Sequence, residues 1–141
     1  MKRTAVAALL LFCGSAQAAD AGKAPQVTSV RVFSGDATIT GQKIEVPNKP
    51  KVVVSLTTFP PGSRLRVHKH LYPHYVYVLE GTLTVTNVDT GKTFDVPKGR
   101  FFAEMTNTWH FGRNNGTTPV KILVIDQLPP GVTSNVIAKS P

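Results

Sequence analysis

Four histidines lie close together in this sequence, at spacings typical of a metal site. They are His68, His70, His74 and His110. Imidazole is a common ligand for Zn, Cu, Fe and Ni. Side chains at positions i and i+2 of a strand point to the same face, so His68 and His70 project together. Because a tight turn at residues 71–73 can bring His74 back beside them, the pattern predicts a site for one divalent transition metal: Fe, Mn, Cu, Ni or Zn.

Three residues near the histidines are candidate catalytic residues. Glu104 lies in the segment that leads to His110, and it is the best candidate for a general base. Arg66 falls on the same predicted strand face as His68, where it either binds a substrate carboxylate or points into solvent. Tyr72 either donates a hydrogen bond to a bound oxygen or occupies a surface turn. The chain has no histidine left for a Ser-His-Asp arrangement, because all four are assigned to the metal.

The charge of the chain favours some partners over others. It has 16 Lys and Arg residues against 8 Asp and Glu, a formal net charge of +8. Excess positive charge favours anionic small molecules. The basic residues are scattered and are not interleaved with stacking aromatics, so nucleic acid is not an expected partner.

The N-terminus has the pattern of a secretory signal peptide. Lys2 and Arg3 precede an apolar run at residues 4–14, and Ala18 ends a small-residue cleavage site. We expect residues 1–18 to be removed and the protein to be periplasmic or secreted, with no membrane association after cleavage. The apolar run is shorter than the ~20 residues that span a bilayer. A lipoprotein at Cys13 is a weaker alternative, because Phe12 precedes it where a small residue is expected.

Short β-rich runs between turn signals predict one all-β domain at residues 27–131, a sandwich or barrel. A flexible lead-in at 19–26 precedes it, and the tail at 132–141 either pairs at a sheet edge or stays loose. The expected strands are 27–33, 39–46, 51–59, 64–70, 74–79, 82–88, 92–96, 109–113 and 120–127.

The histidine segment resembles the motifs of the cupin family of jelly-roll barrels. The first cupin motif is G-x5-H-x-H-x3-4-E-x6-G, and Gly62, His68, His70 and Gly81 match it, with His74 where the Glu usually stands. The second motif is G-x5-P-x-G-x2-H-x3-N. It is matched by Gly91, Pro97, Gly99, His110 and Asn114, with ten residues (100–109) in place of the x2 gap.

The resemblance implies a cupin-type jelly roll in which His68, His70, His74 and His110 all bind the metal and Asn114 supports a strand. Four neutral ligands would leave the ion its full charge and favour an anionic ligand. Similar proteins imply a dioxygenase-like oxidoreductase acting on a small organic molecule, with lyase or isomerase chemistry also possible. The alternative is a non-catalytic protein that binds a metal or small ligand. The resemblance further implies a homodimer, with Tyr75 and Tyr77 on its outer face.

Overall fold

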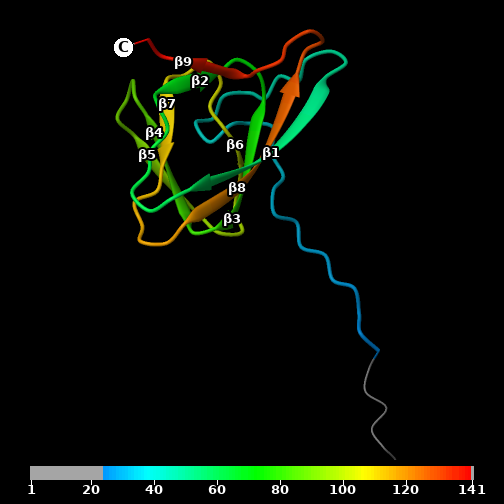
Figure 1. The fold of residues 1–141 in the computed structure, drawn as a ribbon. Helices are drawn as coiled ribbons and strands as arrows, with labels where there is room; N and C mark the ends of the chain where they lie inside the picture. Colours follow the sequence, from blue (N-terminus) through cyan, green and yellow to red (C-terminus); the bar gives the residue numbers. More distant parts are fainter. Residues whose placement is uncertain (1–23, 141) are drawn as a thin grey trace, which may run out of the picture.

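The computed structural model describes residues 24–140 as an all-β structure of two antiparallel sheets (Figure 1). The expected signal peptide lies outside these residues. Within the described part, no helix is long and apolar enough to cross a membrane. The strands are β1 (Lys51–Phe59), β2 (His68–His70), β3 (His74–Glu80), β4 (Thr82–Asn87), β5 (Thr93–Pro97), β6 (Phe101–Ala103), β7 (His110–Arg113), β8 (Val120–Leu128) and β9 (Val136–Ala138).

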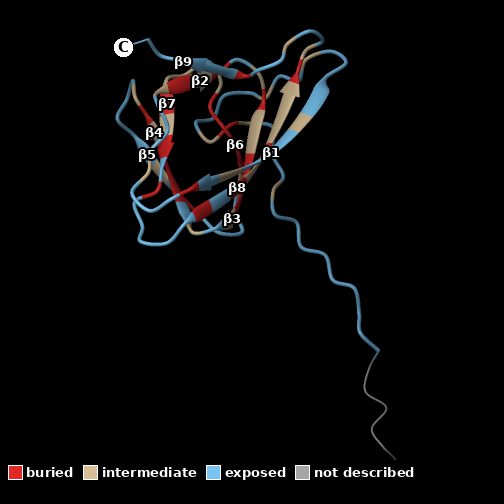
Figure 2. Cartoon of the chain, in the orientation of Figure 1, coloured by how far each residue is buried: buried red, intermediate tan, exposed pale blue. Residues whose placement is uncertain are grey.

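One sheet has the strand order β1-β8-β3-β6, and the other has the order β5-β4-β7-β2-β9. Apolar side chains from both sheets meet between them, where Figure 2 shows the buried segments. Val76 and Val78 of β3 are 1% and 0% exposed, as their alternation predicts, and Val85 of β4 lies opposite them in the same core. This packing confirms the expected all-β jelly roll.

The predicted strands agree with the structure best where the chain is β-branched and apolar. The expected strand at 51–59 is β1, and the expected strands at 74–79, 82–88, 92–96, 109–113 and 120–127 correspond to β3, β4, β5, β7 and β8 within about one residue. Two expectations were wrong. Residues 27–33 form no strand, and 39–46 contribute only one bridge, Ala37 with Lys43. Neither segment has a neighbouring strand along its length, and alternation alone does not make a sheet.

In the second sheet, the strand that carries His68 and His70, β2, lies between β7 and β9. The expected strand at 64–70 is shorter than predicted: β2 contains only residues 68–70, and Arg64 makes an isolated bridge with Arg113. The tail, for which two outcomes were open, pairs at the sheet edge. Strand β9 runs antiparallel to β2, with His68 opposite Ala138 and His70 opposite Val136. The C-terminal segment therefore covers the outer edge of the strand that carries both histidines.

Candidate metal centre

Three of the four histidines come together between the sheets. His68 and His70 lie on β2, and His110 begins β7 directly opposite His68 in the strand register. One nitrogen from each ring lies within 4.8 Å of the other two. The three residues are 7%, 2% and 1% exposed, so water has almost no access to them. This arrangement of imidazole nitrogens is one that can hold a metal ion.

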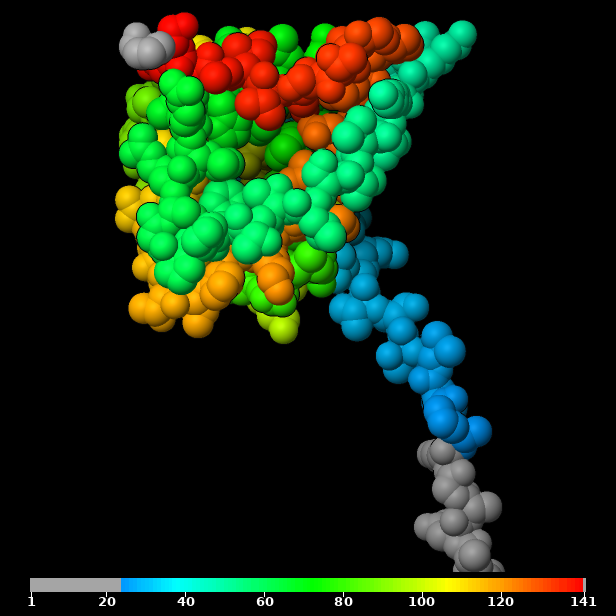
Figure 3. Space-filling model, in the orientation of Figure 1, coloured from blue at the N-terminus to red at the C-terminus, as the bar shows by residue number. Residues whose placement is uncertain are grey.

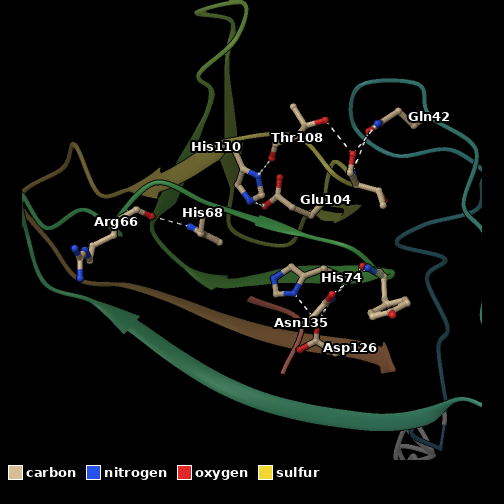
Figure 4. A network of polar contacts seen from close by, with 11 residues as sticks. Gln42, Arg66, His68, His74, Glu104, Thr108, His110, Asp126 and Asn135 are labelled. Atoms are coloured by element: carbon tan, nitrogen blue, oxygen red, sulfur yellow. Dashed lines mark hydrogen bonds and ion pairs between the residues drawn. The ribbon is translucent and has the colours of Figure 1, made fainter. Parts of the chain in front are cut away.

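Backbone carbonyls orient two of the rings. Nδ1 of His68 lies 2.8 Å from the carbonyl oxygen of Arg66, and Nδ1 of His110 lies 2.8 Å from that of Thr108 (Figure 4). A carbonyl oxygen can only accept a hydrogen bond, so each Nδ1 carries the proton and donates it. The Nε2 atom of each ring is then left with a free lone pair, which is the form that binds a metal.

Several buried polar atoms at this place have no hydrogen-bond partner among the residues that the structure describes. They are both ring nitrogens of His70, Nε2 of His110 and Oε1 of Glu104. A buried polar group without a partner costs roughly 1–3 kcal/mol, and such groups are rare in native proteins. Their concentration at one point indicates that something else binds there. A divalent cation would bind one nitrogen of each ring and the carboxylate, and would leave the second nitrogen of His70 without a partner.

Burial keeps the histidine rings neutral. Desolvation lowers the pKa of His110 to about 4, and only part of this shift is offset by the hydrogen bond with Thr108. The pKa of His70 is strongly lowered by the same burial and by the charges of the neighbouring histidines, and the pKa of His68 is lowered as well. Unprotonated imidazole is the ligand form, so the rings are ready to bind a metal near neutral pH.

Glu104, the predicted general base, lies inside the site. It follows β6, and its backbone N–H donates to the carbonyl oxygen of His74 at 2.7 Å. Its Oε2 atom lies 4.0 Å from Nε2 of His110, and the residue is 6% exposed. Burial raises the pKa of this carboxyl to about 7, because no cation nearby fully compensates the lost hydration. The structure therefore places one carboxylate beside His110, outside the group of mutually close ring nitrogens.

His74 lies beside the three-histidine group and makes a different contact. Its ring stacks on the ring of His70 with centroids 3.8 Å apart, and its Nδ1 lies 2.8 Å from Oδ1 of Asp126. Burial would raise the pKa of Asp126, but the hydrogen bond with His74, the charge of that ring and a bond from Asn135 together lower it. A fourth histidine ligand therefore stays a prediction, since the group of mutually close nitrogens contains three.

Asn135 is a structural residue of the site that the sequence did not reveal. It is 4% exposed and lies in the tail segment just before β9. Its Oδ1 accepts from the backbone N–H groups of Leu71 and Tyr72, while its Nδ2 donates to the Tyr72 carbonyl and to Asp126 at 2.8 Å. Asn135 thus joins the C-terminal segment to the turn between β2 and β3. No local pattern marks it, because two of its partners, Leu71 and Tyr72, are more than 60 residues away in the sequence.

The other two predicted catalytic residues lie at the margin of the site. Arg66 is exposed, and its guanidinium group points away from the imidazoles (Figure 4). Together with Leu65, His68, Val136 and Ala138, it lines a mostly apolar pocket of about 320 Å³. Tyr72 lines a different pocket, of about 470 Å³, that includes Gln42 and Thr106. The larger pocket does not include the three histidines. The smaller pocket includes one of them, His68.

Asn114 supports a strand connection, as the resemblance implied. It is 2% exposed, and its side-chain amide donates to the carbonyl oxygens of Phe59 and Thr118 at 3.0 and 2.8 Å. Its Oδ1 accepts from the N–H of Gly116 at 2.9 Å. With its polar atoms used in this way, it stabilises the loop between β7 and β8.

Comparison with protein families gives one match that covers half of the chain. A model described as a cupin domain matches residues 55–126, from within β1 into β8. The matched segment includes all four histidines and Glu104.

Individual relatives match only part of their own length. L-ectoine synthase from Hyphomonas neptunium is 28% identical over 74 residues, which are 52% of this chain and 55% of that enzyme. Among solved structures, the DMSP lyases RdDddP and RnDddQII give a TM-score of 0.53 at 18% identity, over 63% of this chain and 44% of theirs. A formate complex of Lactobacillus farciminis oxalate decarboxylase gives 0.52 at 20%, over 62% and 26%. At these identities the two structures show the fold alone.

Proposed function

This chain belongs to the cupin family, and we propose that it is a metal-dependent enzyme acting on a small organic molecule. The proposed ligands are His68, His70 and His110, whose ring nitrogens lie mutually close. Glu104 lies outside that group, 4.0 Å from Nε2 of His110, and we propose it as the fourth ligand once an ion is bound. The observation that carries the proposal is the set of buried ring nitrogens and the carboxylate oxygen that have no hydrogen-bond partner among residues 24–140.

The distance between Glu104 and His110 is consistent with ligands of one ion. Protein nitrogen and oxygen ligands lie about 2.0–2.2 Å from a metal, so two ligands on opposite sides are about 4.2 Å apart. The observed separation of 4.0 Å is within that reach. The carboxylate would also neutralise part of the ionic charge. Where most cupins have their Glu, this chain has His74, whose Nδ1 is bound to Asp126. We propose that Glu104, whose Oε2 lies 4.0 Å from Nε2 of His110, supplies the missing carboxylate.

A bound divalent transition metal would supply Lewis-acid or redox chemistry at its open coordination positions. Three imidazoles suit Fe, Ni, Cu or Zn, and the carboxylate also makes Mn acceptable. The protein's own residues hold the ion, exclude water and orient the rings through the carbonyl oxygens of Arg66 and Thr108. Asp126 orients His74 next to the ligand ring of His70.

The pocket beside His68 supports a small substrate with an apolar body. Leu65, Val136 and Ala138 provide most of its lining, and Arg66 provides its cationic group. The positive charge of the chain favours an anionic molecule in the same way. We therefore propose a small organic anion whose apolar part occupies this pocket.

For the reaction we propose a dioxygenase-like oxidation. With Glu104 bound to the ion and Asp126 bound to His74 and Asn135, the described side chains offer no further free carboxylate at the three histidines. A second candidate is lyase or synthase chemistry without O2, favoured by the likeness to L-ectoine synthase. Non-catalytic binding of a metal or small ligand is the alternative to both. We also propose that the protein is exported and acts in the periplasm or outside the cell.

Metal content and oxygen consumption test these proposals together. The protein starting at Ala19 is purified and its metals are measured by elemental mass spectrometry, alongside His70→Ala. About one equivalent of Fe, Mn, Cu, Ni or Zn per chain, lost in the variant, supports the site. Oxygen uptake is then measured with a panel of small organic acids. Turnover that needs O2 supports the oxidation, while turnover without O2 supports the lyase candidate. If no metal is retained or can be added back, the proposal fails.

A further inference from the structure

We propose that the outer face of strands β2, β7 and β9 binds the surface of an anionic lipid bilayer. The proposal is independent of the metal centre, which lies on the other side of the same sheet. The three strands are neighbours at one end of the order β5-β4-β7-β2-β9. In Figures 1 and 3 the C-terminal segment that contains β9 runs along the surface of the molecule. Six side chains define this basic face, three cationic and three apolar: Arg64, Lys69, Lys139, Trp109, Phe111 and Ile137.

The strand alternation that directs the metal ligands inward directs this second set outward. Lys69 lies between the two buried histidines of β2, and Ile137 of β9 lies opposite Lys69. Trp109 and Phe111 lie on either side of His110, which is buried. Successive side chains of a strand point to opposite faces, and directly opposite residues point to the same face. The four therefore lie on the side away from the metal centre.

The fold places a cation over each aromatic ring of this face. Nζ of Lys69 lies 4.9 Å from the centroid of the Trp109 ring, and Nζ of Lys139 lies 5.7 Å from the same centroid. Cζ of Arg64 lies 4.2 Å from the centroid of the Phe111 ring. Contacts between a cation and an aromatic ring are attractive within about 6 Å. Basic residues that are scattered along the sequence are thus gathered around two aromatic side chains in the structure.

No carboxylate neutralises the basic face. Segments 59–79, 105–125 and 127–141, which supply its three strands, contain no Asp or Glu. Arg64 lies opposite Arg113 in an isolated bridge, and like charges opposite each other destabilise a sheet. The acids of this sheet, Asp89 and Asp95, lie on or beside β5, at the edge farthest from β9. An anionic partner would therefore relieve a repulsion that the described residues leave in place.

The apolar members of the face favour a bilayer over a soluble acidic polymer. Ile137 is 39% exposed beside Lys69, and Trp109 is half-buried. Cations alone suffice to bind a soluble polyanion. Tryptophan and apolar side chains flanked by Lys and Arg are typical of proteins that lie between lipid headgroups and acyl chains. The sequence predicts no membrane association because its apolar run is too short to span a bilayer, but binding at the surface needs no spanning segment.

Vesicle co-sedimentation tests the proposal. The protein starts at Ala19, because the apolar run at residues 4–14 would otherwise bind lipid itself. The vesicles contain either phosphatidylcholine alone or equal parts of phosphatidylcholine and phosphatidylglycerol. Binding to the mixed vesicles should be at least about 100-fold stronger at low salt, and it should weaken as salt is added. Equal binding to the two kinds of vesicle overturns the proposal.

A pair of double variants tests whether this face is the one that binds. Arg64→Gln with Lys139→Gln should lower the affinity for the mixed vesicles about 30-fold, because two cations are removed from the face. The matched control is Lys51→Gln with Lys121→Gln, which removes the same charge from exposed positions on β1 and β8 of the other sheet. The control should bind nearly as well as the wild type. Circular dichroism establishes that both stay folded, and an equal loss of affinity in the two contradicts the proposal.

Fluorescence distinguishes a bilayer from a soluble polyanion. Trp109 is the single tryptophan of the chain, so its emission reports on this face alone. On the mixed vesicles the emission should shift to shorter wavelength and be quenched by brominated lipid. Ile137→Ser should weaken vesicle binding about fivefold and leave binding to heparin unchanged. Tight binding to heparin without binding to vesicles would indicate a soluble polyanion instead, and unchanged Trp109 emission on bound vesicles would show that another face makes the contact.

Discussion

Oε2 of Glu104 lies 4.0 Å from Nε2 of His110, and the two side chains are 6% and 1% exposed. Among the described residues, neither Nε2 of His110 nor the second carboxylate oxygen of Glu104, Oε1, has a hydrogen-bond partner. The buried pair therefore lowers the stability of the metal-free protein, and a cation bound between the two side chains would raise it. Stability measured with and without metal should reveal this difference.

The first prediction concerns Glu104→Gln in the metal-free protein. The pKa of Glu104 is raised from 4.5 to about 7 in the folded state. Between pH 4.5 and 7 the folded state keeps this proton, whereas the unfolded chain has released it. The resulting loss of stability is absent below pH 4.5, grows between pH 4.5 and 7, and is complete above pH 7. The variant should be more stable than the wild type by about 3 kcal/mol at pH 8, and equal to it at pH 4. Urea unfolding of chelator-treated protein measures both.

Glu80→Gln is the matched control for that experiment. This carboxylate is 50% exposed and pairs with Lys121 on the surface at 3.0 Å. Its removal should change stability little, and by nearly the same amount at both pH values. A Glu104→Gln variant that gains no stability at pH 8 would show that the carboxyl is not held in a dehydrated site.

The second prediction separates the three-histidine site from the four-histidine site. His70→Ala should lose the metal, because His70 is in the group of mutually close nitrogens. His74→Ala should keep about one equivalent, since His74 is not in that group. Glu104→Gln should bind the metal more weakly. Elemental mass spectrometry and competition with a chromogenic chelator give the content and the affinity. Loss of metal in His74→Ala with retention in Glu104→Gln would restore the four-histidine prediction.

The third prediction concerns Asn135→Ala. Asn135 makes four hydrogen bonds that join the tail, the turn after β2 and Asp126. Its removal leaves the backbone N–H groups of Leu71 and Tyr72 and the Tyr72 carbonyl without these partners, while Oδ1 of Asp126 keeps only its bond with His74. The free energy of unfolding should therefore fall by about 2–4 kcal/mol. Thr133→Ala, on the exposed part of the same tail, should have little effect. Thermal unfolding compares the two, and equal melting temperatures would contradict the role of Asn135.

The fourth prediction concerns the turn between β3 and β4. Gly81 has φ +72°, and a Cβ atom there would lie 2.8 Å from Cγ2 of Val120 and 3.0 Å from the carbonyl oxygen of Pro119. Gly81→Ala therefore adds backbone strain and a steric clash, and should cost at least about 2 kcal/mol. Gly91 also has a positive φ, of +69°, but a Cβ there would meet nothing within 4 Å. Gly91→Ala should cost less, and chemical denaturation of both variants checks the order.

Much of the candidate site was predictable because it depends on local geometry. His68 and His70 share a face of β2 because side chains alternate along a strand, whatever the rest of the fold is. The strands around them were predictable where β-branched residues dominate, as in β1 and β8. The prediction of strands failed at residues 27–33, where apolar side chains alternate, and at 39–46, where the pattern was weaker. A strand is stable only with a neighbour, and the sequence does not say which neighbour exists.

The sequence by itself determined the jelly-roll class, the histidine pair of β2 and the presence of His110 on a later strand. Only the tertiary structure decided which acid joins the histidines and where His74 points. Glu104 enters the site because its backbone binds the His74 carbonyl. His74 binds Asp126 because β3 and β8 are paired in a register that sets these two residues opposite each other. Local alternation follows from backbone geometry, whereas such pairs depend on long-range strand register, which many residues set together.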